Sequence, residues 1–189
     1  MPAWAWALIG VGIALAVAFV VFEGLRLRRT RRLRGRFGPE YERTLASHGD
    51  RTRAEGELRE RERRREHLEI RSLPVEERER YRASWEQVQA RFVDDPGGAV
   101  TDADGLVGRV MAARGYPTGH FEERSADISV DHPEVVEHYR AAHAIALAQE
   151  HGRADTERQR EAMVHYRALF EELVETAPAS GRSGHDDER

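Results

Sequence analysis

The 189-residue sequence contains no cysteine and no lysine. Without cysteine, the chain can form no disulfide, no thiolate zinc site and no cysteine nucleophile. All 30 basic residues are arginine. Arginine is used even in dense, exposed charge runs, where the forked shape of the guanidinium group is not required. We therefore interpret the missing lysine as a coding bias rather than as a functional signal.

The motifs of common enzymes are also missing. The chain has no Walker loop, no dinucleotide fingerprint and no G-x-S-x-G nucleophile elbow. It has neither an H-E-x-x-H pair nor the E-x-x-H pair of di-iron bundles. Glu134 and His138 share a helical face and could act as two metal ligands, with His165 or His120 as a third. This spacing, however, matches no known metal site. We expect no enzyme activity, no cofactor and no metal ion.

Charge is absent from residues 3–22, AWAWALIGVGIALAVAFVVF. At about 1.5 Å rise per residue, a helix of this length crosses a hydrocarbon core of roughly 30 Å. Residues 23–39 then form a basic juxtamembrane segment that is expected to contact anionic lipid headgroups. Its seven arginines are Arg26, Arg28, Arg29, Arg31, Arg32, Arg34 and Arg36. The sequence predicts a single-pass transmembrane helix with a basic collar.

The arginines lie on the C-terminal side of the apolar run, which favours an N-terminus outside the cell membrane and a cytoplasmic C-terminal domain. A cleaved signal peptide is the alternative, because Ala16 and Ala18 form an Ala-x-Ala pattern. Signal peptides, however, carry their positive charge before a shorter apolar stretch. An exported protein that begins after Ala18 is therefore the less favoured interpretation.

The remaining charge is unevenly distributed. Residues 40–73 are dense in both signs and have no heptad of apolar residues, which is typical of a charged stalk or linker, either helical or disordered. Residues 81–189 carry 12 arginines against 21 acidic residues, a net charge of −9. Because phosphate backbones repel such a surface, we expect no nucleic-acid partner.

Residues 74–176 show the periodicity of amphipathic helices and predict an antiparallel helical bundle, so the fold class is all-α. The first apolar stripe consists of Tyr81, Trp85, Val88 and Phe92. Trp85 lies in the middle of this stripe and is expected in the core. Residues 177–189 are small, polar and charged, and we expect a disordered tail there.

Capping residues delimit three further helices. Asp95 is predicted to cap the second helix, which stops at Gly115. Asp131 is predicted to cap the third helix, and Thr156 the fourth. Residues 118–130 show no helical stripe, and their alternating Ile128 and Val130 are typical of a short extended piece.

The tetrapeptide H-Y-R-A occurs twice, at residues 138–141 and 165–168. One interpretation is a polar rim around a pocket that senses a small molecule or metal, where paired arginines grip a carboxylate or phosphate. Its residues would be His138, Arg140, His165 and Arg167. The other interpretation is that similar helix environments select similar residues, and we favour it because repeat architectures need at least three copies.

Several short segments of the sequence are specific enough to suggest a family. They are Trp85-Glu86-Gln87-Val88-Gln89, Arg91-Phe92-Val93-Asp94-Asp95-Pro96, Arg114-Gly115-Tyr116-Pro117, Ser129-Val130-Asp131-His132-Pro133 and His165-Tyr166-Arg167. In these segments the chain resembles an uncharacterised family of small bacterial proteins, which are often loosely described as secreted. The resemblance extends from the apolar run to Val174. The resemblance implies an N-terminal membrane segment and a helical domain, and it implies no activity.

The sequence therefore predicts a membrane-anchored helical domain that binds an unknown protein partner on the cytoplasmic face. Small residues at four-residue spacing, Gly10, Ala14 and Ala18, would also let two membrane helices approach closely, so a homodimer is a further hypothesis.

Overall fold

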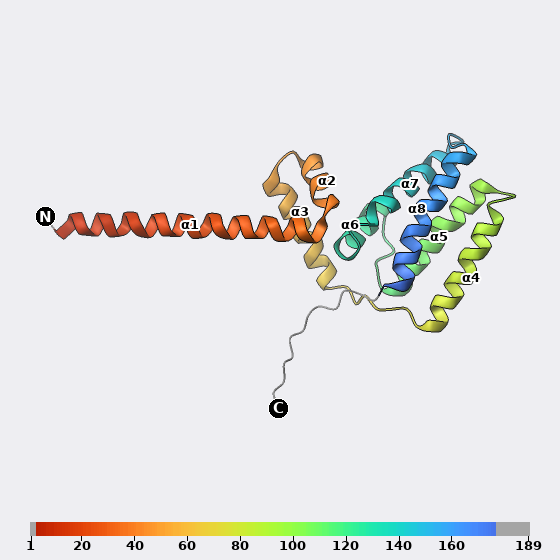
Figure 1. Cartoon of the computed structure of the whole chain (residues 1–189), viewed down its shortest axis with the longest axis horizontal. Coiled ribbons are helices and arrows are strands. Elements are labelled where there is room, and N and C mark those ends of the chain that lie inside the picture. The colour runs from red at the N-terminus through yellow and green to blue at the C-terminus, as the bar shows by residue number, and fades with distance from the viewer. Residues whose placement is uncertain (1–2, 177–189) are drawn as a thin grey trace, which may run out of the picture. The chain divides into compact units, whose positions relative to one another are not determined.

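The computed structural model describes the backbone of residues 3–176 and the side chains of residues 15–176. Within these residues the secondary structure consists of eight helices and no strand (Figure 1). The helices are α1 (Ala3–Phe37), α2 (Pro39–His48), α3 (Arg51–Glu66), α4 (Val75–Arg91), α5 (Pro96–Arg114), α6 (Phe121–Asp131), α7 (Val136–Glu150) and α8 (Thr156–Glu175). The predicted all-α fold is confirmed. The expected tail, residues 177–189, lies outside the described residues.

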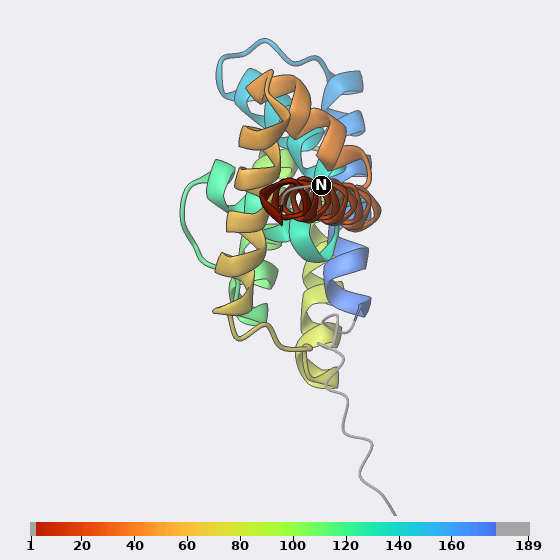
Figure 2. The same cartoon turned by 90° about the vertical axis from the view of Figure 1, so that its left-hand side faces the viewer.

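The chain forms two compact units, Met1–Leu58 and Arg59–Arg189, and the boundary falls within α3. In the first unit, α1 is one continuous helix of 35 residues. Gly49, at a positive φ of 64°, ends α2, and the chain then turns into α3 (Figures 1 and 2). Residues 40–73 thus contain two helices separated by a turn.

The expected membrane span is only partly described. No helix in the described part of the chain has an apolar stretch long enough to cross a membrane. Of the expected span 3–22, the side chains of residues 3–14 lie outside the described residues. Gly10 and Ala14, which were expected to pair two such helices, are among them.

The second unit is a helical bundle with a closed apolar core. Helix α8 packs against α5 and α7, and α4 packs against α5, as Figure 1 shows. The largest buried apolar side chains come from these helices and include Leu106, Met111, Tyr139, Tyr166, Leu169 and Leu173. Their burial supplies the main stabilisation of the unit.

Several local predictions for this unit are confirmed. Trp85 and Val88 are buried, and Tyr81 and Phe92 pack partly buried against the same core. The Asp95 carboxylate accepts a hydrogen bond of 2.9 Å from the backbone N–H of Gly98 and caps α5. Gly115 ends α5 at a positive φ of 98°, where a side chain would also clash with the carbonyl of Glu69.

The extended piece predicted around Ile128 and Val130 is wrong, because these residues belong to α6. All six residues of 125–130 are buried, so this part of the helix is covered around its whole circumference and shows no apolar stripe. Its two serines are tolerated there because their hydroxyls donate to carbonyls of the same helix, Ser125 to Glu122 and Ser129 to Ala126.

Two predicted caps are also wrong. Asp131 ends α6 instead of capping the next helix, which begins at Val136 without a side-chain cap. Thr156 is the first residue of α8, and the cap is Asp155, whose carboxylate accepts a 2.9 Å hydrogen bond from the N–H of Arg158. The Asp131 carboxylate does not cap a helix because it accepts a hydrogen bond from the Tyr116 hydroxyl, a tertiary contact.

Candidate functional site: an exposed apolar helix and a groove in the bundle

The first candidate site is the part of α1 whose apolar side chains are exposed to solvent. Eight large apolar side chains between Leu15 and Leu27 are 49–68% exposed. They are Leu15, Val17, Phe19, Val20, Val21, Phe22, Leu25 and Leu27. Because consecutive residues such as Phe19 to Phe22 point in different directions around a helix, the apolar surface encircles α1 instead of forming one stripe.

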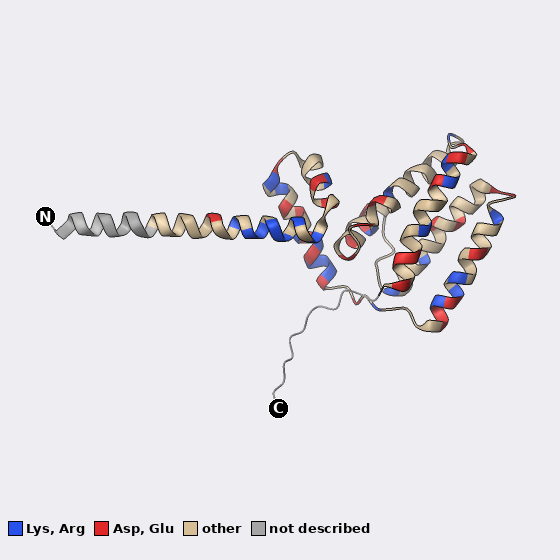
Figure 3. Ribbon diagram, in the orientation of Figure 1, with Lys and Arg blue, Asp and Glu red and all other residues tan. Residues whose placement is uncertain are grey.

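All seven arginines of the basic collar are exposed. Figure 3 shows them gathered on the stretch of α1 that follows the uncharged stretch. The opposite face carries Thr30, Leu33 and Phe37, which are buried. Their spacing of three and four residues places them on one side of the helix and leaves the guanidinium groups on the others.

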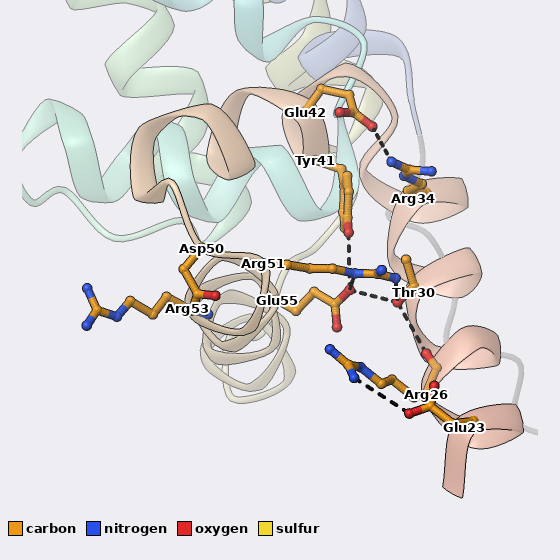
Figure 4. A network of polar contacts seen from close by, with 10 residues as sticks. All are labelled: Glu23, Arg26, Thr30, Arg34, Tyr41, Glu42, Asp50, Arg51, Arg53 and Glu55. Carbon is orange, nitrogen blue, oxygen red and sulfur yellow. Dashed lines mark hydrogen bonds and ion pairs between the residues drawn. The ribbon is translucent and has the colours of Figure 1, made fainter. Parts of the chain in front are cut away.

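A polar network fixes this face of α1 to α2 and α3 (Figure 4). The Glu55 carboxylate accepts hydrogen bonds from the Thr30 hydroxyl at 2.7 Å, the Tyr41 hydroxyl at 3.1 Å and the Arg51 Nε at 2.9 Å. Burial alone would raise the pKa of Glu55, but the hydrogen bonds from Arg51, Thr30 and Tyr41 outweigh burial and lower the pKa. Arg51 also donates to the Thr30 hydroxyl. The network therefore joins three helices through one carboxylate.

The predicted polar rim does not form. His138 and His165 do meet, with their Nδ1 atoms 2.8 Å apart. Arg140 instead pairs with Glu137 of its own helix, and Arg167 with Glu171, each at 2.8 Å. Residues two positions apart on a helix point roughly 200° apart, so each H-Y-R-A sends its histidine and its arginine to opposite sides.

The second candidate site is a groove between α4 and α8, which consists of two adjoining hollows of about 190 and 200 Å³. Trp85, Gln89 and Arg167 line both hollows. The remaining lining residues are Phe92, Arg160, Met163 and Val164 in the first, and Arg82, Glu86, Phe170, Glu171, Val174 and Glu175 in the second. We call these two hollows the α4–α8 groove.

Aromatic side chains form much of the groove's apolar floor. The rings of Trp85 and Phe170 stack with centroids 5.0 Å apart. The Trp85 indole N–H is buried and has no hydrogen-bond partner among the described residues. Of the four predicted rim residues, only Arg167 lines the groove.

Polar residues inside the bundle join helices rather than line a cavity. The Tyr166 hydroxyl donates a 2.8 Å hydrogen bond to Asp104, and the His143 Nδ1 lies 3.8 Å from the same oxygen. Burial raises the pKa of Asp104, but His143 and Tyr166 lower it by more, and the net shift is downward. The His143 ring stacks on Phe121 at 3.7 Å. This cluster ties α5, α7 and α8 together.

A second buried cluster surrounds Arg114, whose side chain is completely buried. Its Nη1 donates a 2.7 Å hydrogen bond to the Leu173 carbonyl, and burial lowers the pKa of Arg114. The His132 Nδ1 lies 2.8 Å from Glu172. Burial lowers the pKa of His132 although the hydrogen bond with Glu172 opposes that shift. Sequence reasoning missed this cluster because its partners are up to 59 residues apart.

No three histidine, aspartate or glutamate side chains in the described part of the chain lie close enough together to hold a metal ion. The proposed pairing of Glu134 and His138 with a third ligand is not seen there.

Comparisons of the chain with protein-family models, with curated proteins and with solved structures found no match. The resemblance to small bacterial membrane-anchored proteins stays a prediction.

Proposed function

We propose that this chain is a single-pass membrane protein whose helical bundle binds another protein on the cytoplasmic face. The N-terminal part of α1 is the anchor, and the arginines that follow it contact anionic lipid headgroups. The bundle provides the protein-binding surface. No enzyme activity is proposed.

One observation carries the anchor: the encircling apolar surface between Leu15 and Leu27 continues directly into the basic collar on the same helix. Removing a leucine, valine or phenylalanine side chain from water is worth about 1.5–3 kcal/mol. Eight such exposed side chains make an aqueous environment costly for this helix. A lipid bilayer covers every side of a helix at once, as an encircling apolar surface requires.

The collar sets the orientation. Arginines close to the end of an apolar helix favour the cytoplasmic side, and each contributes about 1 kcal/mol of attraction to the anionic inner leaflet. Because Thr30, Leu33 and Phe37 form the buried face of this part of α1, the arginines on its other faces stay exposed toward the headgroups.

The bundle supports protein binding better than small-molecule sensing. Small-molecule sites usually bury most of the ligand's surface, whereas the two adjoining hollows of the groove, of about 190 and 200 Å³, lie open at the surface. Of the residues expected to rim a sensing pocket, only His138 and His165 meet, whereas each arginine pairs with a glutamate of its own helix. A shallow groove with aromatic residues in its floor is typical of protein recognition.

The absence of cysteine makes the orientation directly testable. Single variants Ala3→Cys and Ser72→Cys would be treated with a membrane-impermeant maleimide on intact cells and after permeabilisation. We expect Ala3→Cys to react on intact cells and Ser72→Cys to react only after permeabilisation. Labelling of Ser72→Cys on intact cells would contradict the cytoplasmic orientation.

Alkaline carbonate extraction tests the anchor independently of its orientation. We expect the full-length chain to stay in the membrane pellet, because carbonate strips only peripheral proteins. Release into the supernatant would refute a membrane-spanning anchor. A mature chain that begins after Ala18, found by mass spectrometry, would instead support the exported protein.

A further inference from the structure

We propose that the bundle contains a phosphate-binding site between α4, α5 and the segment that joins α3 to α4. The site is a hollow of about 260 Å³ that opens to solvent. We call it the α4–α5 hollow, and its lining residues are Arg71, Glu77, Arg80, Tyr81, Ser84 and Ala113. It shares no lining residue with the α4–α8 groove. This inference goes beyond the proposed protein binding and does not rest on it.

The polar side chains of the hollow come from two segments of the chain. The four lining residues of α4 are three, one and three positions apart, which places them on one face of the helix. Arg71 comes from the segment before α4. Its backbone N–H donates a 2.8 Å hydrogen bond to the carbonyl of Arg114 at the end of α5. This bond holds the backbone of Arg71 beside the helices that form the rest of the hollow.

The lining carries a net positive charge, because it contains two arginines and one glutamate. Arg71 and Glu77 pair with each other at 3.2 Å and are neutral together. The excess charge therefore belongs to Arg80, which is exposed and forms no ion pair among the described residues.

The acidic residues next to Arg80 on α4 do not neutralise it. Glu79 pairs with Arg82 at 2.9 Å. Glu76 contacts Arg80 only through its backbone carbonyl, which accepts a 3.4 Å hydrogen bond from the Arg80 Nε. A neutral carbonyl leaves the positive charge of the guanidinium group unpaired, so this charge is available to an anion in the hollow.

Three side chains of the hollow have donors that no strong acceptor uses. Arg80 has five N–H donors and makes only the long Nε contact with its own helix. Arg71 uses only Nη2 in its ion pair. The Tyr81 hydroxyl lies 3.5 Å from the Arg109 carbonyl, beyond the usual O–H···O range of about 2.5–3.0 Å. Ser84 is not such a donor, because its hydroxyl donates to the Arg80 carbonyl at 2.9 Å.

This set of donors fits phosphate better than carboxylate. A phosphate group has three strong acceptor oxygens and a charge of about −1.5 to −2, so it can accept from all three side chains at once. A carboxylate has only two oxygens. Guanidinium groups also bind phosphate through two parallel hydrogen bonds. The ligand is therefore a phosphate group, either on a soluble compound or on a lipid headgroup.

The test uses the full-length chain in a non-ionic detergent that contains no phosphate, with inorganic phosphate as the probe. Phosphorus NMR measures the line width of the phosphate signal, which broadens when the ion exchanges with a site on the protein. We expect broadening that saturates with phosphate concentration. Acetate at the same ionic strength should not remove it.

A pair of arginine variants locates the binding. Arg80→Gln should weaken the affinity for phosphate at least about fivefold, because it removes the unpaired charge. Arg158→Gln removes an exposed arginine outside the hollow and should leave the affinity unchanged. Tyr81→Phe should weaken the affinity roughly threefold through the loss of one neutral donor.

A second pair predicts a gain of affinity, which misfolding cannot imitate. Glu77→Gln removes the only acidic residue of the lining and should strengthen phosphate binding about two- to fivefold. Glu79→Gln removes the same charge from the same helix outside the hollow. It should leave the affinity unchanged.

Lipid nanodiscs distinguish the two sources of the phosphate group. If the ligand is a lipid headgroup, phosphatidic acid in the nanodisc should abolish the broadening that depends on Arg80, whereas phosphatidylcholine alone should leave it. If the ligand is a soluble compound, the broadening should persist in both kinds of nanodisc.

Absence of saturable broadening, or equal broadening for Arg80→Gln and Arg158→Gln, would overturn the phosphate site. Removal of the broadening by acetate would overturn the preference for phosphate. Equal effects of Glu77→Gln and Glu79→Gln would show that the hollow is not where phosphate binds. None of these results affects the labelling and extraction experiments, which test the membrane-anchored orientation separately.

Discussion

The hydroxyl of Tyr116 donates a 2.8 Å hydrogen bond to Oδ2 of Asp131 and so joins the end of α5 to the end of α6. Arg65 donates to the same oxygen, and the Asp131 side chain is only 4% exposed. Burial, together with the neighbouring Asp131 carboxylate, raises the pKa of Tyr116. Tyr116 thus remains a neutral hydrogen-bond donor at physiological pH.

Tyr116→Phe should destabilise the bundle by about 1–3 kcal/mol, because it leaves a buried carboxylate without one of its donors. Thermal unfolding of the full-length protein, followed by circular dichroism, should show a melting temperature lowered by several degrees. Tyr81→Phe is the control, since the Tyr81 hydroxyl has only a 3.5 Å solvent-exposed contact with a carbonyl. Equal melting temperatures for the two variants would contradict a stabilising role of the Tyr116 bond.

Glu55 should make the first unit sensitive to acid. Its pKa is lowered in the folded state from the ordinary value of 4.5, so its stabilising contribution is present above that value and is lost as the pH falls through the folded pKa. Unfolding free energies measured between pH 7 and pH 3 should fall more steeply for the wild type than for Glu55→Gln. Parallel pH profiles would show that Glu55 is not responsible.

Asp127 should have the opposite pH dependence. Burial raises its pKa, and the ion pair with Arg64, at 3.6 Å, only partly offsets this effect. A raised carboxylate pKa gives stability that is present below the unfolded pKa and is lost as the pH rises through the folded pKa. Asp127→Asn should therefore leave the unfolding free energy at pH 7 unchanged or higher. A decrease of more than about 1 kcal/mol would contradict this prediction.

Reversal of charge in the collar should disturb the membrane orientation. Arg28, Arg29 and Arg31 are exposed and form no ion pair among the described residues. The triple variant with glutamate at these positions removes much of the positive charge that favours the cytoplasmic side. Maleimide labelling of Ser72→Cys in this background should then appear on intact cells.

The control for this experiment places glutamate at Arg153 and Arg158, which lie beyond the 15–20 residues over which charge sets orientation. It should leave Ser72→Cys protected on intact cells. Equal labelling of both backgrounds would show that the collar does not set the orientation.

The sequence by itself determined the features that depend on neighbouring residues. Spacings of three and four residues placed Trp85 and Val88 on the buried face of α4, and Asp95 and Gly115 marked the ends of α5. These signals are local because a helix brings residues three and four positions apart to the same face. The apolar run and the arginines after it were equally plain in the sequence.

Only the tertiary structure decided the features that depend on distant partners. Helix α6 escaped prediction because residues 125–130 are all buried, which removes the periodic contrast between apolar and polar positions over most of the helix. Aspartate is a residue type that often caps helices, but the Asp131 carboxylate caps none, because it accepts hydrogen bonds from Tyr116 and Arg65. The two H-Y-R-A copies did not form one rim, because helix geometry turns each histidine away from its arginine, and the packing of α7 against α8 brings only the histidines together.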